Sequence, residues 1–311
     1  MLIEKEPSIF WGVSGEPYSR QVRIASASRT FDLHLRRLET LAEYRQCELL
    51  QARIWGPDDV GCVSPLVMIT AQENGGMAIG AFVGEQLVGF VCSFLGMTED
   101  GGLKQCSVLM AVDPELRNSN LGFHLKAVQR EVALAQGIKL ITWTFDPLAS
   151  PNAKLNVHKL GCVASRYLPN CYGTFSGGLN AGMPTDRFLV EWWLRERRVE
   201  ECLNGTPPAT PAEAEPVNEV APHPGSGLPH IRRFDLGRGA PALLVEVPPD
   251  IQAIKRVDLE VARAWTDCFR EIFPCYFGRG YQVTGFVPLP GEHRGRCGYV
   301  LSRVGGGWVM A

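Results

Sequence analysis

The sequence predicts an α/β fold in which a mixed β-sheet is flanked by helices, followed by a small α/β C-terminal extension. Three observations support this prediction: apolar runs of strand length, amphipathic segments of helical period between them, and a proline-rich stretch before the last part of the chain. At 311 residues the chain is long enough for one large domain or two smaller ones.

The composition is that of an ordinary globular protein. Apolar residues make up 45% and charged residues 21%, and the formal net charge is −2. This charge balance argues against a nucleic-acid partner. The sequence contains neither a run of eighteen apolar residues nor a secretory leader, which argues against a membrane partner. We therefore expect a cytoplasmic protein.

The ten cysteines and six histidines are scattered, and no two cysteines form a C-x-x-C pair. Several cysteines lie inside apolar strand-like runs, as Cys92 does in Phe-Val-Cys-Ser-Phe. Buried reduced thiols therefore fit the sequence better than disulfides or a metal site, and we expect no metal.

The first part of the chain predicts an arm, a strand, a helix and a hairpin. The first twenty or so residues carry Gly and Pro without periodicity, and we assign residues 1–29 to an irregular N-terminal arm. Residues 31–38 alternate as a half-buried strand does, and residues 39–55 have the spacing of a helix that ends at Gly56-Pro57. Residues 77–94 form two apolar runs around Gly84-Glu85, which predicts a hairpin.

The stretch from Met110 to Gly122 holds the most informative pattern. A strand-like run, residues 106–112, ends in a short turn, and Arg117 then opens a tight loop that leads into an amphipathic helix. The apolar stripe of that helix consists of Leu121, Leu125, Val128 and Val132. The first N–H groups of a helix have no partner inside it, and the helix dipole is positive at that end. Such a loop is suited to binding a pyrophosphate.

The following segments continue the alternation of strands and helices. We expect a strand at 138–145, a short helix at about 152–160 that ends at Gly161, and strands at 162–168 and 186–194. Seven of the 22 prolines fall between Pro207 and Pro229, so residues 203–229 predict a linker or a long surface loop.

Residues 230–311 predict a compact β-α-β-β extension. Its expected elements are a strand at 242–249, a helix at 256–273 and strands at 280–286 and 299–302. The same order occurs in residues 138–194, which indicates a weak internal repeat. The alternative is an unrelated extension whose strands lengthen or cover the main sheet.

The strand, the Arg-x-x-x-x-Gly loop and the helix together resemble the cofactor loop of the GCN5-related N-acyltransferases, which bind acyl-coenzyme A. The usual loop of that family is Gln/Arg-x-x-Gly-x-Gly/Ala. Arg117 and Gly122 match its ends, and Asn120, which tolerates positive φ, stands where the first Gly is expected. The resemblance covers about residues 30–195 and implies the splayed sheet of the acyl-CoA N-acyltransferase fold for residues 30–202.

The resemblance also implies which residues bind the cofactor. The backbone of Met110, Ala111 and Val112 would pair with the pantetheine arm, and one N–H there would polarise the thioester carbonyl. The pyrophosphate would lie against the loop and the first helical turn, which comprise Arg117, Asn118, Ser119, Asn120, Leu121, Gly122 and Phe123.

A second segment resembles the family pattern Asn-x-x-Ala-x-x-x-Tyr-x-x-Leu-Gly-Phe. Ala153 and Leu160-Gly161 are in register with it, and Asn152 and Asn156 would contact the pantetheine amides. Asn152 is alternatively a helix N-cap after Pro151. The tyrosine position of the pattern is Val157, so the residue that protonates the leaving thiolate must be sought elsewhere or the role left to solvent.

Catalytic candidates follow from the chemistry of amine acylation. Tyr167 and Tyr172 are the nearest replacements for the tyrosine, and Glu99 is a candidate to remove a proton from the amine. Other carboxylates considered for that proton are Asp100, Asp146 and Glu191. Each of these carboxylates is alternatively a solvated loop charge or a cap. Positioning and oxyanion stabilisation would then supply most of the catalysis.

Residues 184–193, with Phe145-Asp-Pro-Leu148, resemble a subgroup of these acyltransferases that carries a long C-terminal extension. Some members of the subgroup look like succinyl-CoA-dependent amino-acid N-succinyltransferases. Arg187 would then bind a substrate carboxylate, with Asp146 as a second substrate-binding residue. The alternative for Arg187 is a surface ion pair with Asp186 or Glu191.

We therefore expect an N-acyltransferase in which a small-molecule amine attacks the thioester directly, without a covalent enzyme intermediate. Acetyl-CoA is the default donor, and succinyl-CoA with an amino-acid acceptor is the specific alternative. Two competing classes are a non-catalytic acyl-CoA sensor, for which the change at Val157 leaves room, and a scaffold without cofactor. The extension either shapes the acceptor pocket or mediates homodimerisation.

Overall fold

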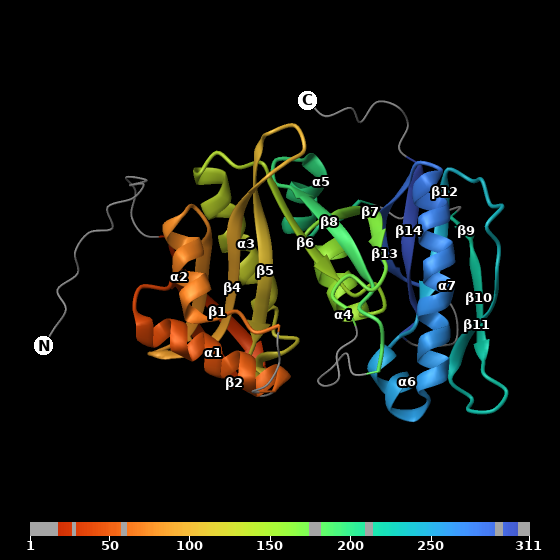
Figure 1. Cartoon of the computed structure of the whole chain (residues 1–311), viewed down its shortest axis with the longest axis horizontal. Coiled ribbons are helices and arrows are strands. Elements are labelled where there is room, and N and C mark those ends of the chain that lie inside the picture. The colour runs from red at the N-terminus through yellow and green to blue at the C-terminus, as the bar shows by residue number, and fades with distance from the viewer. Residues whose placement is uncertain are drawn as a thin grey trace, which may run out of the picture. The chain divides into compact units, whose positions relative to one another are not determined.

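A computed structural model describes residues 18–26, 29–56, 61–173, 182–208, 214–289 and 295–303. The chain divides into two compact units between Thr142 and Trp143 (Figure 1). The division differs from the expected boundaries at residues 202 and 230. Its physical reason lies in aromatic packing, because Phe188 of the expected first domain contacts Phe273 of the extension with 4.6 Å between ring centroids.

The first unit is an antiparallel sheet with helices on both faces. Its strands lie in the order β1-β2-β3-β4-β5, and β5 pairs in parallel with the start of β6. The elements are β1 Ser19–Ser26, β2 Arg29–Arg37, α1 Leu41–Trp55, α2 Pro65–Glu73, β3 Met77–Val83, β4 Gln86–Met97, β5 Leu103–Val112, a 3₁₀ turn Pro114–Leu116, α3 Leu121–Ala135 and β6 Leu140–Phe145.

Local sequence signals account for the ends of these elements. Thr40 and Glu43 form a reciprocal capping box at the start of α1. Gly84, with φ of 59°, begins the two-residue turn of the β3–β4 hairpin. Gly137, with φ of 76°, follows α3. The mixed sheet with flanking helices confirms the predicted fold class.

Helices cover the two faces of this sheet through different residues of β4. Phe90 and Cys92 belong to an apolar core with Tyr44 and Cys47 of α1. Gly89 points the other way, where a Cβ atom would meet the Leu121 side chain of α3 at 3.2 Å. Alternation along one strand therefore separates α1 from α3.

The second unit contains a second set of strands with its own helices. The elements are α4 Ser150–Ala153, a π-helical turn Lys154–Lys159, β7 Val163–Leu168, β8 Arg187–Trp193, α5 Arg197–Leu203, β9 Glu215–Pro216, β10 Asn218–Pro222, β11 Pro229–Phe234, β12 Ala242–Val247, α6 Ile251–Val257, α7 Leu259–Gly278, β13 Tyr281–Pro288 and β14 Cys297–Arg303. The sheet of this unit begins at the end of β6 and has the order β8-β7-β13-β14-β12-β9, and β10 and β11 form a separate hairpin.

Two expected irregular segments contain strands. Ser19–Ser26 pairs with β2, so strand structure begins inside the expected N-terminal arm, and residues 1–17 lie outside the described residues. The expected linker contains β9 and β10 and the first residue of β11. The linker prediction was wrong there because packing on α7 offsets a proline-rich composition, as the Trp265 indole N–H donates to the Pro229 carbonyl at 2.9 Å.

All ten cysteines are free. Burial raises the pKa of Cys92 to about 12 and also raises that of Cys47. None of the described helices has the length and hydropathy needed to cross a membrane.

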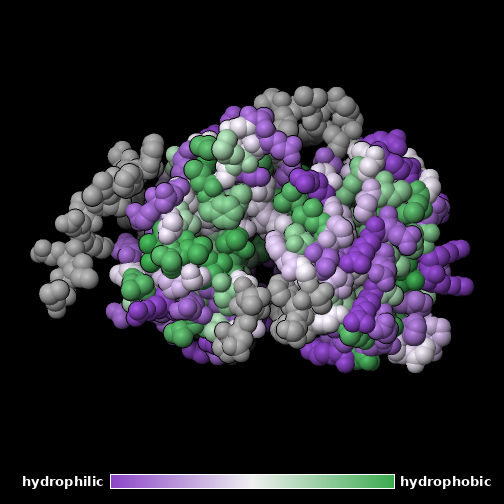
Figure 2. Space-filling view, in the orientation of Figure 1, coloured by the Kyte–Doolittle hydropathy of each residue, from purple (hydrophilic) through white to green (hydrophobic). Residues whose placement is uncertain are grey.

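Figure 2 shows hydrophobic residues gathered on one face of the first unit, over α2, β4 and β5. The exposed apolar side chains of these elements are Leu66, Val67, Phe94, Leu95, Met97, Leu103 and Val108.

Candidate functional site

The loop between β5 and α3 is held by short-range contacts. Asp113, which is 5% exposed, caps the 3₁₀ turn by accepting the Glu115 N–H at 3.0 Å and also pairs with Arg53. Ser119 is buried, and its hydroxyl donates to the Leu116 carbonyl at 2.6 Å. These bonds fix the start and the middle of the loop and leave its outer residues exposed.

Two asparagines give the loop its curvature. Asn118 has φ of 64° and Asn120 has φ of 73°, and both are exposed. Asn120 thus takes the left-handed conformation that asparagine tolerates, at the position where the resembled loop has a glycine. Left-handed residues that alternate with right-handed or extended ones turn successive N–H groups to one side, which is the geometry of backbone anion sites.

Helix α3 begins directly after Asn120. The Asn120 side chain makes no capping hydrogen bond, and its carbonyl accepts the N–H groups of Phe123 and His124 at 3.1 and 3.2 Å. The N–H groups of Leu121 and Gly122 belong to the first helical turn, where helix geometry provides no acceptor. Arg117 is exposed beside them. Positive charge and helix dipole therefore combine at this end of α3.

The end of β5 is paired on one side. β4 pairs with it through Gly89↔Val112, Phe90↔Ala111 and Val91↔Met110. On the other side, the β5–β6 ladder in the described part of the first unit consists of Gln105↔Ile141 and Cys106↔Thr142. Met110 to Val112 therefore lie outside that ladder, and their backbone groups on this edge are suited to an added extended partner.

Glu99 lies far from this loop. It is exposed in the turn between Thr98 and Gly102 that joins β4 to β5. The ten residues of β5 span about 30 Å, and the loop follows the other end of that strand. This position argues against Glu99 as a proton acceptor beside the loop.

Sequence reasoning did not find a buried polar layer between β5 and α3. Lys126 is 2% exposed, and its Nζ donates to Ser107 Oγ at 2.8 Å and to Gln129 Oε1 at 3.0 Å. Gln105, two residues before Ser107, is also buried. The signal was present in the sequence, since Gln105 and Ser107 are two residues apart and therefore fall on one face of β5. The layer fixes the position of α3 against β5.

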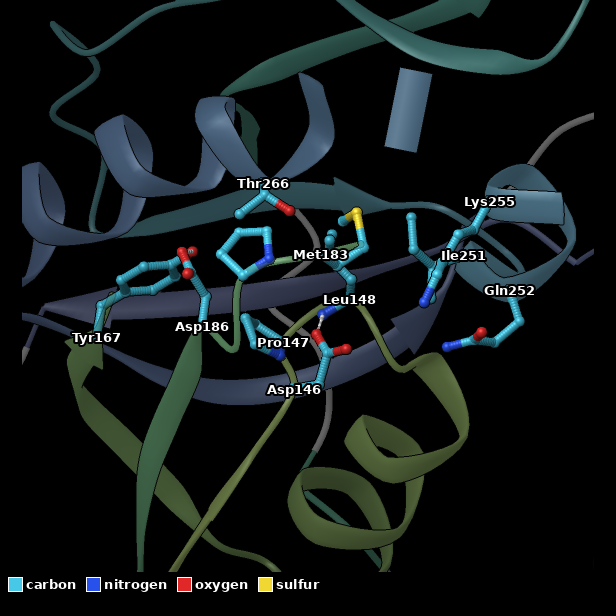
Figure 3. Close-up of a pocket in the computed structure, with 11 residues that line it drawn as sticks. Asp146, Pro147, Leu148, Tyr167, Met183, Asp186, Ile251, Gln252, Lys255 and Thr266 are labelled. Carbon is cyan, nitrogen blue, oxygen red and sulfur yellow. Dashed lines mark hydrogen bonds between the residues drawn. The ribbon is translucent and has the colours of Figure 1, made fainter. Parts of the chain in front are cut away.

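In the second unit, Asp146 follows β6 and faces a small cavity (Figure 3). Its Oδ1 accepts the Leu148 N–H at 2.8 Å. Burial raises the pKa of Asp146, while the Leu148 N–H and the Arg187 charge act in the opposite direction. The cavity has a volume of about 20 Å³, which is room for one water molecule, and Lys255 of α6 also lines it.

Asp186 lies at the same cavity with its partners already in place. Arg270 of α7 donates from Nε and Nη2 to the two carboxylate oxygens at 2.8 and 2.9 Å. The Tyr167 hydroxyl donates to Oδ2 at 2.6 Å, and the Asn170 N–H donates to Oδ1 at 2.9 Å. Burial opposes ionisation of Asp186, but these bonds outweigh it and lower its pKa.

This arrangement gives Tyr167 a structural role. Burial and the bond to Asp186 raise its pKa, and its ring stacks on Phe273 at 6.1 Å. A hydroxyl that donates to a buried carboxylate is a poor source of a proton for a thiolate. The geometry therefore does not support the expected catalytic role of Tyr167.

Tyr172 and Arg187 lie together at one end of the second unit's sheet. The Tyr172 side chain is 55% exposed, and its hydroxyl is 2.7 Å from Thr144 Oγ1 of β6. The Arg187 guanidinium lies 5.6 Å from the centre of the Tyr172 ring. Asp186 forms its ion pair with Arg270 instead of Arg187. Within the described residues Arg187 forms no ion pair, and its Nη1 donates to the backbone carbonyl of Asp186 at 3.2 Å. The alternative of an ion pair with Asp186 or Glu191 is therefore wrong in this part of the chain.

The second cofactor segment departs from a regular helix. Asn152 is exposed in α4, whereas Asn156 is buried in the π-helical turn. The Asn152 side chain makes no N-cap bond, because residue 149 occupies the cap position. Val157 is 1% exposed and belongs to the core. Val157 therefore packs in the core at the position where the family pattern has a tyrosine, and it cannot donate a proton.

Among the described residues, no group of three or more His, Cys, Asp or Glu side chains is arranged to hold a metal ion.

No protein-family model and no curated protein matches this sequence. Solved structures do match. An acetyltransferase of the GNAT family from Streptococcus pneumoniae is 15% identical, with 51% of this chain and 97% of that chain covered and a TM-score of 0.42. The ribosomal-protein-S18-alanine N-acetyltransferase from Escherichia coli is also 15% identical, with 53% and 95% covered and a TM-score of 0.42.

An insect putative arylalkylamine N-acetyltransferase from Aedes aegypti is 9% identical, with 60% of this chain and 99% of that chain covered and a TM-score of 0.46. These identities and TM-scores are too low to assign an activity to this chain.

Proposed function

We propose that this protein is an acyl-CoA-dependent N-acyltransferase of the GCN5-related type. The observation that carries the proposal is the loop after β5, in which Asn118 and Asn120 have positive φ directly before the uncapped start of α3. Backbone N–H groups and a helix dipole at one place favour a group with two phosphates.

The first unit would bind the donor. Arg117 and the N–H groups of Leu121 and Gly122 would bind the pyrophosphate, and the edge of Met110 to Val112 would pair with the pantetheine amides. Val108, 51% exposed on the same strand, offers an apolar surface for the methylene groups of the arm. Acetyl-CoA is the simplest donor for this site.

The second unit would bind the acceptor. The Arg187 charge lies close enough to Asp146 to oppose the rise in its pKa that burial causes. A carboxylate and a guanidinium together suit an acceptor that carries both an amine and a carboxylate. We therefore propose an amino acid as acceptor, and succinyl-CoA as the alternative donor suggested by residues 184–193.

The reaction would proceed by direct transfer. The neutral amine nitrogen attacks the thioester carbonyl carbon, the new C–N bond forms, and the C–S bond breaks to release the coenzyme A thiolate. The amine loses a proton to solvent or a carboxylate, and the thiolate gains one. Tyr172 is the proposed proton donor, because its hydroxyl is exposed and its partner is the neutral hydroxyl of Thr144.

An assay of thiol release tests the proposal directly. Purified protein is mixed with acetyl-CoA or succinyl-CoA and a panel of L-amino acids, and free coenzyme A is measured with a thiol reagent. Arg117→Ala should weaken acyl-CoA binding about tenfold, because one charge-assisted contact is lost. Lys139→Ala, an exposed change beyond the other end of α3, is the matched control and should have no effect.

Binding without turnover would instead support a non-catalytic acyl-CoA sensor, the alternative favoured by the buried Val157. If neither acyl-CoA binds by calorimetry and Arg117→Ala changes nothing, the proposed function is wrong.

A further inference from the structure

The sheet of the second unit contains two copies of one β-α-β-β arrangement. The strand order is β6-β8-β7-β13-β14-β12. In each half, the strand that comes first in the sequence (β6 or β12) lies at the outside, the last (β8 or β14) lies next to it, and the middle one (β7 or β13) lies at the centre. The copies meet where Ala164 of β7 pairs antiparallel with Val283 of β13. Antiparallel neighbours are related by a two-fold axis perpendicular to the sheet, so this pair marks a local pseudo-two-fold axis.

The strand register within the two hairpins also supports the pseudo-two-fold relationship between the copies. In the β7–β8 hairpin the ladder shifts between Ala164 and Arg166. In the β13–β14 hairpin it shifts between Val283 and Gly285, directly after the residue that pairs with Ala164. A β-bulge at the same place in both hairpins is a specific feature and not a consequence of strand pairing in general.

Thr144 of the first copy, with the Tyr172 hydroxyl bonded to it, lies on the sheet face away from α7. Trp143 and Phe145 contact Trp192 and Phe188 at 5.9 and 5.8 Å between ring centroids. Phe188 in turn contacts α7. Thr144 lies between the two aromatic residues in β6 and therefore points to the opposite face. The Tyr172 hydroxyl bonds to it there.

Glu246 holds the corresponding place in the second copy. It is the next-to-last residue of β12, as Thr144 is of β6. Its neighbour Val245 pairs with Tyr299, whose ring lies 5.8 Å from Phe273 of α7. Glu246 consequently also points away from α7.

A cavity of about 580 Å³ lies at this place in the second copy. Cavities of this size hold small organic ligands. It is open to solvent on one side and is lined by residues of β12 and the β10–β11 hairpin, with Leu244, Phe234 and Val217 as apolar lining. It lies in the second unit, and its lining includes none of Asp146, Tyr172 and Arg187.

Three guanidinium groups line the cavity and offer more N–H donors than their partners use. Arg296 binds both oxygens of Glu246, which is 6% exposed. Arg233 donates to Glu219 from Nε at 2.6 Å, and its side chain is otherwise 79% exposed. Each guanidinium has five N–H groups, so several remain for a ligand.

Arg238 adds a buried donor at the same cavity. Its Nε has no hydrogen-bond partner among the described residues. Asp235 Oδ2 lies 3.0 Å from this Nε as an ion pair, but the two groups are not aligned for a hydrogen bond. The Arg238 side chain as a whole is 41% exposed, so its terminal N–H groups can donate to an acceptor oxygen of a ligand.

We propose that this cavity is a second small-molecule site, which binds an organic carboxylate with an apolar group. The carboxylate would lie against Arg233 and Arg238, and the apolar group against Leu244 and Phe234. The proposal is for binding alone, without transfer of a group to the ligand.

Binding of simple carboxylates to the full chain tests this proposal. The probes are N-acetyl-L-leucine and hexanoate, with L-leucine amide as the probe that lacks a carboxylate, measured by titration calorimetry. Both carboxylates should bind and the amide should not. Arg233→Gln should weaken binding about tenfold, whereas Arg232→Gln, the neighbouring exposed arginine outside the cavity, should change it less than twofold.

Two further variants locate the binding. Leu244→Trp should abolish it by filling the cavity, and Arg187→Gln in the first copy should leave it unchanged. Failure of both carboxylates to bind at 10 mM, or equal weakening by Arg232→Gln and Arg233→Gln, would overturn the proposal. Because Arg233→Gln is an exposed change, it tests the site even if Leu244→Trp does not fold. These outcomes are independent of the thiol-release assay, so the two proposals can fail separately.

Discussion

Asp186 and Arg270, which are 84 residues apart in the sequence, form a bidentate ion pair, with Nε 2.8 Å from Oδ2 and Nη2 2.9 Å from Oδ1. Asp186 precedes β8, which belongs to the first copy, and Arg270 lies in α7 of the second. The extension thus contributes directly to the residues around the Asp146 cavity.

Arg270→Met should destabilise the protein by about 2–3 kcal/mol, because it leaves the buried Asp186 carboxylate without its main partner. The folded-state pKa of Asp186 is lowered, so its contribution is present above the unfolded pKa of about 3.9 and is lost as pH falls through the folded value. Urea unfolding at pH 7 and pH 3 measures the effect, which should be smaller at pH 3. A loss of equal size at both pH values would contradict the ionised pair.

Asp146→Asn should have the opposite sign. The folded-state pKa of Asp146 is raised by burial, so ionisation at pH 7 destabilises the fold. The amide should therefore stabilise the protein at pH 7, and the gain should vanish below the unfolded pKa of about 3.9. If Asp146 also binds the acceptor amine, KM for the amine should rise about tenfold in the same variant. Thermal unfolding at the two pH values and steady-state kinetics give both results.

Asn120 tests the backbone of the cofactor loop. With φ of 73°, Asn120→Val should cost about 1–2 kcal/mol and weaken acyl-CoA binding, because a β-branched side chain opposes the left-handed conformation. Asn120→Gly is the matched control and should keep both stability and binding. Equal binding by the two variants would show that the loop conformation does not matter for the cofactor.

Tyr172→Phe tests the proton donor. It should lower kcat about 100-fold and leave KM within twofold, because the hydroxyl is needed only as the thiolate leaves. Tyr167→Phe is the comparison, since it removes a bond to Asp186 at 2.6 Å. That variant should lower the melting temperature and keep kcat within twofold. The assignment fails if the two variants exchange these effects.

Local features of this fold could be predicted from the sequence. The strand before Val112, the amphipathic helix α3 and the left-handed Asn120 depend on nearby residues, and all three are present. Helix α2 was not predicted, although Ser64 caps it and Pro65 stands at its first turn, which are typical start signals. Leu66 and Val67 are exposed and Met68 is buried, so the apolar residues of this helix do not fall on one face.

Long-range features could not be predicted in the same way. The role of Tyr167 depends on Asp186, and that of Asp186 depends on Arg270, which no spacing reveals. The hairpin around Pro222 and Pro229 depends on packing against α7, whereas its composition indicated a linker. The repeat was visible only as an order of elements, and the matching bulges at Ala164 and Val283 give it a register.

The pairing of Ala164 with Val283 has a consequence for dilute solutions. Two separate chains joined along a strand edge come apart once their concentration falls below the dissociation constant. Here one polypeptide supplies both edges, so the effective concentration of the partner strand is set by the intervening chain and not by the number of molecules. Dilution should therefore not separate β7 from β13, and specific activity should not fall through loss of this strand pairing.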